Sequence, residues 1–142
     1  MIRIGVPLSV EEFFKHLPTP EERLSFPIRR RTFFGESVDL ASSRYRMYKE
    51  KGVKCVHCGR EGTVFILERS HVRDISPHFN LYAVEENGKL ILMTRDHIVP
   101  KSRGGKDEMS NYQPLCTKCN CKKGSRTEEE LFPPKTMEAC YG

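Results

Sequence analysis

The chain contains no tryptophan and no long apolar run. A helix that crosses a bilayer needs about 18 or more consecutive apolar residues, so the sequence excludes a membrane span of that kind. Residues 1–10 also lack the apolar segment after a basic start that marks a secretory signal peptide. No internal repeat or low-complexity segment occurs. The absences therefore favour an intracellular globular protein.

Large apolar side chains are scarce. Hydrophobic residues make up 37% of the 142 residues, and the aromatic residues are 8 Phe and 5 Tyr. A chain of this length fits one domain, with room for an appended arm. A small domain with a modest core often needs a cross-link or a bound metal. The composition therefore predicts that something besides apolar burial stabilises the fold.

Basic charge is concentrated in two segments. Residues 28–54 carry eight basic and three acidic side chains, a balance of +5. Residues 89–126 carry nine basic and three acidic side chains, a balance of +6, whereas the rest of the chain is net acidic. Charge gathered in this way indicates a polyphosphate partner rather than an evenly solvated surface.

Four of the six cysteines form two pairs of equal spacing, Cys55-x-x-Cys58 and Cys116-x-x-Cys119. In an intracellular chain this pattern favours zinc over disulfides. Four thiolates leave no open position on the ion, so we expect a structural site. A competing assignment replaces one sulfur by His57. Of the other two cysteines, Cys121 is expected to be a bystander and Cys140, in the tail, a free thiol.

The first half of the chain carries helix signals. Within the first 27 residues, Ser9 with Glu12 and Thr19 with Glu22 form capping boxes, which predict two short helices. A third, strongly basic helix is expected to start at Ser37 or Asp39, run to about Lys51 and stop at Gly52. Its basic side chains either face solvent or contact a nucleic-acid backbone.

The second half carries strand signals. Strands are predicted at residues 63–68, 81–84, 89–94 and 112–115, with Asn87-Gly88 as a hairpin turn between the second and third. A helix is expected from Cys116 to Lys123, ended by Gly124, and another capping box joins Thr127 to Glu130. The strand that begins at Lys89 leads directly into Asp96-His97.

Four polar residues around this strand have the chemistry that phosphodiester hydrolysis needs. Asp96 is a hard oxygen ligand for Mg²⁺ or Mn²⁺, and His97 can activate a water molecule. Asn120 follows the zinc ligand Cys119, so its amide is expected as a second metal ligand. Asn111 is expected to hydrogen-bond across the loop that presents His97. Neighbours on a strand face opposite sides, so a twist or bulge has to bring Asp96 and His97 toward one phosphate.

These residues, together with Gly104-Gly105, Leu115 and Lys123-Gly124, resemble the HNH endonuclease family. The resemblance covers residues 53–125 and implies an α+β fold with a ββα-metal core. It implies His97 as general base, Asp96 and Asn120 as ligands of one catalytic metal, and Asn111 as a structural residue. Its zinc-bound variety carries two Cys-x-x-Cys pairs, and the chain is similar to small stand-alone enzymes often encoded by bacteriophages. Many members carry His where this chain has Asn120.

The resemblance implies an endonuclease that cuts DNA, double-stranded by preference, leaving 5′-phosphate and 3′-hydroxyl ends. Five basic residues are expected to contact phosphates: Lys101, Arg103, Lys106, Lys122 and Lys123. We expect a cytoplasmic protein, in the host cell if it is viral, with a helical basic arm at residues 1–52, a nuclease domain at 53–126 and a tail at 127–142. The arm is a candidate surface for a protein partner or a homodimer. Two alternatives stay open: a non-catalytic zinc-ribbon binding protein and an RNA-directed nuclease.

Overall fold

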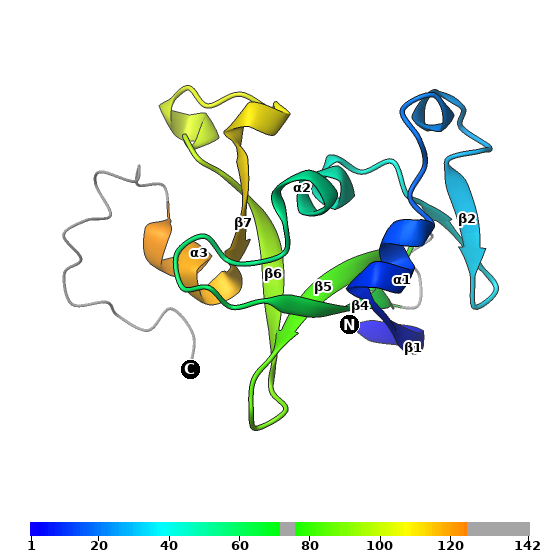
Figure 1. Ribbon diagram of the computed structural model, residues 1–142, viewed down its shortest axis with the longest axis horizontal. Helices are drawn as coiled ribbons and strands as arrows, with labels where there is room; N and C mark the ends of the chain where they lie inside the picture. The colour runs from blue at the N-terminus through cyan, green and yellow to red at the C-terminus, as the bar shows by residue number, and fades with distance from the viewer. Residues whose placement is uncertain (72–75, 125–142) are drawn as a thin grey trace.

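The computed structural model describes residues 1–71 and 76–124. Its centre is an antiparallel five-stranded sheet in the order β1-β4-β5-β6-β7 (Figure 1). The strands are β1 (Ile2–Ser9), β4 (Gly62–Arg69), β5 (His78–Val84), β6 (Leu90–His97) and β7 (Tyr112–Cys116). A separate hairpin pairs β2 (Arg30–Phe33) with β3 (Glu36–Asp39).

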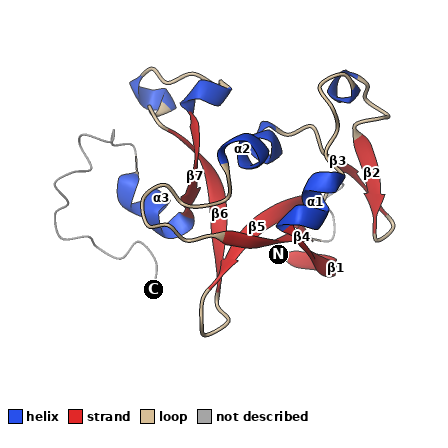
Figure 2. Ribbon diagram, viewed as in Figure 1, coloured by secondary structure: helices blue, strands red, loops and turns tan. Residues whose placement is uncertain are grey.

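Helices flank the sheet on different sides, and Figure 2 shows α2 and α3 on either side of β7. Three short 3-10 turns lie in the connections. The helical elements are α1 (Val10–Lys15), η1 (Glu22–Leu24), α2 (Ser43–Lys51), η2 (Lys101–Arg103), η3 (Met109–Asn111) and α3 (Thr117–Lys123). The molecule is therefore mixed α+β, as the sequence predicts, and β6, β7 and α3 supply the expected ββα unit.

Aromatic stacking forms the centre of the core. The Phe13 ring of α1 stacks on Phe65 of β4 with 3.9 Å between the ring centroids, and Phe79 of β5 meets Phe13 edge-on at 4.9 Å. Tyr45 of α2 joins this cluster and accepts a 2.9 Å hydrogen bond from the Phe79 backbone N–H. Residues from the first 52 positions thus share one core with the central strands, so the two parts are not separate packing units.

The first expected helix is confirmed as α1, which begins at Val10 where the Ser9 hydroxyl accepts the predicted bond from the Glu12 N–H. The sequence analysis did not predict that residues 2–9 before it form a strand along β4. The second capping box also forms, since the Thr19 hydroxyl accepts from the Glu22 N–H at 3.2 Å. It opens only the three-residue turn η1, because nucleating a helix is costly and this segment is too short to offset that cost.

The third predicted helix starts later than expected. Residues 36–39 form β3, because Phe34 and Gly35 take positive φ values of 52° and 80° and close a two-residue hairpin with β2. Helix α2 is capped by Ser42, not by Ser37 or Asp39. Its predicted end is confirmed: Gly52 has φ 96° and its N–H donates to the Tyr48 carbonyl.

The predicted strands are confirmed and extend further than the sequence suggested. The turn at Asn87-Gly88 joins β5 to β6, with the Glu85 N–H donating to the Lys89 carbonyl at 2.9 Å. Helix α3 ends at Gly124 as expected. The capping box at Thr127 and the rest of the tail lie outside the described residues. Among the described residues, no helix has the length and apolar character needed to cross a bilayer.

Truncating the aromatic stack tests this core. Phe13→Ala removes a fully buried ring from between α1 and β4, and we expect it to lower the free energy of unfolding by about 3–5 kcal/mol. Denaturant unfolding of the metal-loaded protein measures the effect. Leu24→Ala is the control, since this side chain is 89% exposed, and should change stability by less than about 0.5 kcal/mol. Equal effects of both changes would show that α1 does not pack as described.

Candidate functional site

Four cysteine side chains from distant parts of the chain meet at one point. The Sγ atoms of Cys55, Cys58, Cys116 and Cys119 all lie within 4.8 Å of one another. A tetrahedral ion with metal–sulfur bonds of about 2.3 Å separates its sulfurs by about 3.8 Å. The distance from Cys58 Sγ to Cys116 Sγ is 3.7 Å. The cluster therefore fits a metal ion such as zinc, with four thiolates and without His57.

The backbone around the cluster shapes each half of it. After Cys55, a tight turn closes when the Gly59 N–H, at φ 80°, donates to the Cys55 carbonyl at 2.9 Å. Cys116 ends β7 and caps α3, because its Sγ accepts from the Cys119 N–H at 3.4 Å. The cluster thus joins the start of α3 to the segment that follows α2.

A guanidinium group that the sequence analysis did not single out lies against these sulfurs. Arg60 Nη1 donates to Cys58 Sγ at 3.2 Å and approaches Cys116 Sγ at 3.8 Å. Burial, the largest single influence, disfavours the Cys58 thiolate, yet hydrogen bonds from the Arg60 backbone, Cys55 and Arg60 lower its pKa to about 7. Burial raises the pKa of Cys119 and of Cys116. A positive charge beside four thiolates offsets part of their repulsion.

The β6–β7 hairpin separates Asp96 and His97. Pairing is regular from Met93↔Cys116 to His97↔Tyr112, without a bulge. Successive side chains therefore point to opposite faces. His97 shares its face with Tyr112, at 5.2 Å between ring centroids, while Asp96 faces α3. The bulge that the sequence analysis allowed is absent from these five pairs.

Asp96 forms a buried ion pair with Lys123 of α3. Lys123 is 0% exposed, and its Nζ donates to Asp96 Oδ2 at 2.8 Å, to the His97 carbonyl at 2.6 Å and to the Ile98 carbonyl at 3.3 Å. Gln113 Nε2 donates to the same Oδ2 at 2.9 Å. The other oxygen, Asp96 Oδ1, accepts no hydrogen bond from the described residues. One carboxylate oxygen thus accepts two hydrogen bonds and the other accepts none from the described residues, in a side chain that is 8% exposed.

His97 is held from the loop between β6 and β7. Its Nε2 lies 2.7 Å from Asp107 Oδ1, and Lys101 Nζ donates to Asp107 Oδ2 at 2.9 Å. The hydrogen bonds from Lys101 and then from His97 lower the pKa of Asp107 to about 2. Asp107 is therefore ionised near neutral pH and acts only as an acceptor.

Asn111 fixes this loop. Its Oδ1 accepts from the Val99 N–H at 2.9 Å, and its Nδ2 donates to the carbonyls of Val99 at 3.0 Å and Lys106 at 2.9 Å. This is the cross-loop contact that the sequence analysis expects. Gly105 has to be glycine, since a Cβ there would come within 1.7 Å of the Val99 carbonyl oxygen. The segment after His97 is thereby folded back against the hairpin.

Asn120 lies on α3, three residues before Lys123 and next to Cys119. Residues three apart in a helix share a face. Lys123 reaches Asp96 from this helix, and Asn120 is partly buried one turn before it.

The five predicted phosphate-contacting residues have different surroundings. Lys101, Arg103 and Lys106 are exposed on the loop, and Lys122 is partly buried on α3. Lys123 requires a correction, because its buried ammonium is committed to three oxygens beneath the surface and is not displayed to a phosphate.

Sequence reasoning missed the roles of Asp107, Lys123, Gln113 and Arg60. A signal existed for two of them. Lys123 follows Asn120 by one helical turn, and Gln113 lies in the strand that precedes Cys116. Asp107 and Arg60 had none, because their partners are fixed by how the loop and the cysteine turn fold.

A comparison with known protein families finds a match to the segment that contains β6, β7 and α3. Residues 88–134 match the family model described as HNH endonuclease. The described part of the match contains β6, β7 and α3 with Asp96, His97, Asn111 and Asn120. This segment, about a third of the chain, is therefore similar to the HNH endonucleases, a family of nucleases. Comparison with curated proteins and with solved structures gives no match.

Removing one thiol tests the metal cluster. Cys55→Ser leaves an ion with three sulfur ligands and loses folding free energy, of which such sites supply on the order of 10 kcal/mol. We expect loss of bound zinc and a largely unfolded protein, measured by elemental analysis and thermal melting. His57→Ala is the control and should keep one zinc per chain. A folded, zinc-loaded Cys55→Ser protein would refute the four-thiol site.

Proposed function

We propose that the chain is an HNH endonuclease that hydrolyses DNA phosphodiester bonds, with His97 as general base and one divalent metal at Asp96 and Asn120. The observation that carries the proposal is the hairpin-and-helix unit matched by the family, in which both site elements are held by specific contacts. The cluster of cysteines acts as its structural zinc site.

The donor set fits a hard cation. Asp96 Oδ1 accepts no hydrogen bond from the described residues, and Asn120 lies on α3 one turn before the Lys123 that reaches Asp96. Carboxylate and amide oxygens are ligands that Mg²⁺ and Mn²⁺ accept. When bound, such an ion neutralises charge on the phosphate and stabilises the departing oxygen. Lys123 holds the second oxygen of Asp96, which orients the carboxylate and reduces the charge that the ion meets.

The contact to Asp107 selects one tautomer of the neutral His97 ring. An ionised carboxylate accepts only, so His97 Nε2 carries the hydrogen and Nδ1 carries the lone pair. Neutral His97 then takes a proton from water through Nδ1. The ring remains oriented because Lys101 holds the second oxygen of Asp107. Asn111 positions the loop between β6 and β7 through its bonds to the backbone of Val99 and Lys106, and it has no direct role in the proton transfer.

Double-stranded DNA is proposed as the substrate, with 5′-phosphate and 3′-hydroxyl products. Support comes from the family match and from the exposed basic residues of the loop, Lys101, Arg103 and Lys106. Phosphate contacts of this kind provide affinity without base recognition. Residues 53–126 are proposed as the nuclease unit, with residues 1–52 extending its sheet and its basic surface.

Replacing the base tests the activity. His97→Ala should lower the rate of Mg²⁺-dependent plasmid cleavage by roughly 10²–10⁴-fold, because no other group takes the proton from water. Binding of a labelled duplex, measured in parallel, should remain. The control is His16→Ala on α1, which should cleave within about twofold of the unaltered protein.

Three results bear on the proposal differently. Undiminished cleavage by His97→Ala would contradict the assignment of the base. Nucleic-acid binding without cleavage by any variant would favour a binding protein, and cleavage of RNA alone would favour an RNA-directed nuclease.

Removing the carboxylate of Asp107 tests whether it positions the His97 ring. Asp107→Ala should lower kcat by roughly 10–100-fold, as loss of an orienting partner does. Nitrogen-15 spectra of the His97 ring should change from a single Nε2–H tautomer to a mixture. Asp107→Asn keeps an oxygen that accepts from Nε2 and should restore most of both readouts. An unchanged tautomer in Asp107→Ala would exclude the positioning role.

A further inference from the structure

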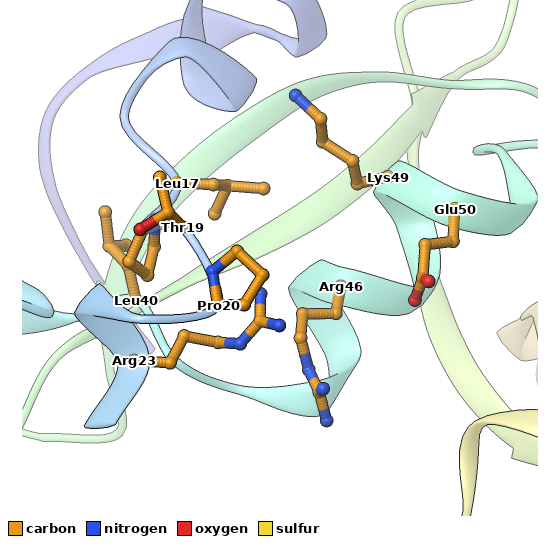
Figure 3. Close-up of a pocket in the computed structure, with 9 residues that line it drawn as sticks. Leu17, Thr19, Pro20, Arg23, Leu40, Arg46, Lys49 and Glu50 are labelled. Atoms are coloured by element: carbon orange, nitrogen blue, oxygen red, sulfur yellow. The ribbon is translucent and has the colours of Figure 1, made fainter.

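A pocket of about 380 Å³ lies between α2 and the segment that leads into η1 (Figure 3). Its apolar wall includes Leu17, Pro20 and Leu40. Arg23 enters from η1, and Arg46 and Lys49 enter from α2. Glu50 supplies one negative charge, so the three basic groups leave the pocket with a net positive charge.

The basic residues of α2 divide into two sets. Arg44 donates to the Phe79 carbonyl at 3.0 Å, and Lys51 donates to the Met109 carbonyl at 2.6 Å, so both anchor the helix to the rest of the fold. Arg46 and Lys49 line the pocket instead. Structural anchoring thus accounts for two of the four basic residues of α2, and the other two line the pocket, with the Lys49 ammonium 5.5 Å from the centre of the Phe14 ring.

Arg46 carries a donor without an acceptor. Its Nε is buried and makes no hydrogen bond within the described residues. A buried donor left unsatisfied costs about 1–3 kcal/mol. Figure 3 shows Arg23 and Arg46 extending into the opening from opposite elements, so two like charges share the pocket. An anion placed there would satisfy the donor and reduce the repulsion.

Helix α2 also connects the pocket to the candidate nuclease site. Its last residue, Lys51, donates to the carbonyls of Met109 and Tyr112, and Tyr112 lies directly opposite His97. Arg46 lies five residues before Lys51 on the same helix, a rise of about 7.5 Å.

We propose that this pocket binds a backbone phosphate of the nucleic acid, with the adjoining sugar against Leu17 and Pro20. Arg23, Arg46 and Lys49 hold the phosphate, and the apolar wall excludes water from the contact. The proposal rests on the proposed function, because it supplies a second anchor for the substrate of that site.

Salt-dependent binding tests the pocket. His97→Ala serves as the background so that a labelled duplex is bound but not cut. On this background, Arg46→Gln should weaken binding about tenfold at moderate salt, and the slope of log K against log salt should fall by about one, as for loss of one phosphate contact. Arg46→Lys keeps the charge and should retain part of the affinity. Lys89→Gln, at the exposed tip of the β5–β6 hairpin, removes an equal charge and should leave the slope unchanged.

The outcomes separate this proposal from the nuclease itself. Equal slopes for Arg46→Gln and Lys89→Gln, with melting temperatures showing both folded, would overturn the pocket while leaving the nuclease intact. Absence of cleavage by the unaltered chain, together with a reduced slope in Arg46→Gln, would reject the nuclease and keep the pocket. In the unaltered background, Arg46→Gln should raise KM more than it lowers kcat. A pocket that captures an acidic peptide and not the duplex would also refute the proposal.

Discussion

Alternation of side chains along β6 determines how the candidate site is built. Since Asp96 and His97 are neighbours on a regular strand, they face opposite sides of the hairpin, and each side has its own support. Helix α3 covers one side and holds Asp96 through Lys123. The loop after His97 folds over the other side and holds the imidazole through Asp107. The proposed function requires both groups to act on one phosphate at the end of β6, where the two sides of the hairpin meet.

The four-cysteine cluster connects the segment after α2 to the start of α3, next to the end of β7. Cys116 and Cys119 fix the start of α3, and Cys55 and Cys58 tie it to the segment behind α2. Arg60 lies against the thiolates and also pairs with Glu85 of the neighbouring hairpin at 3.4 Å. The aromatic core is small, and a metal bound at the four cysteines would add to the stability of the fold. This second source of stability offsets the polar groups buried around Asp96.

Around the site, buried polar groups replace apolar packing. The free energy lost when they leave water is offset by their hydrogen bonds to specific partners. A buried ammonium such as that of Lys123 is tolerated because one carboxylate oxygen and two carbonyl oxygens accept its hydrogen bonds. Asn111 likewise satisfies two backbone groups of Val99 that the tight loop would leave unpaired. In helix α2, Arg44 and Lys51 donate to backbone carbonyls, and Arg46 and Lys49 line the pocket.

Sequence by itself determined the elements whose signals are local. Cysteine spacing predicted the four-thiol cluster, Asn87-Gly88 predicted the hairpin, and Gly52 and Gly124 predicted the ends of α2 and α3. It failed for β1, whose partners in β4 lie 55 to 67 positions further along the chain, and for residues 36–39, which pair with β2 despite helix signals.

Tertiary structure alone decided which charges remain at the surface. Lys123 and Lys122 are equivalent in sequence pattern, yet one lies buried against Asp96 and the other does not. Local patterns specify backbone conformation within a few residues, whereas the partner of a side chain depends on chain segments that meet only when the sheet has formed.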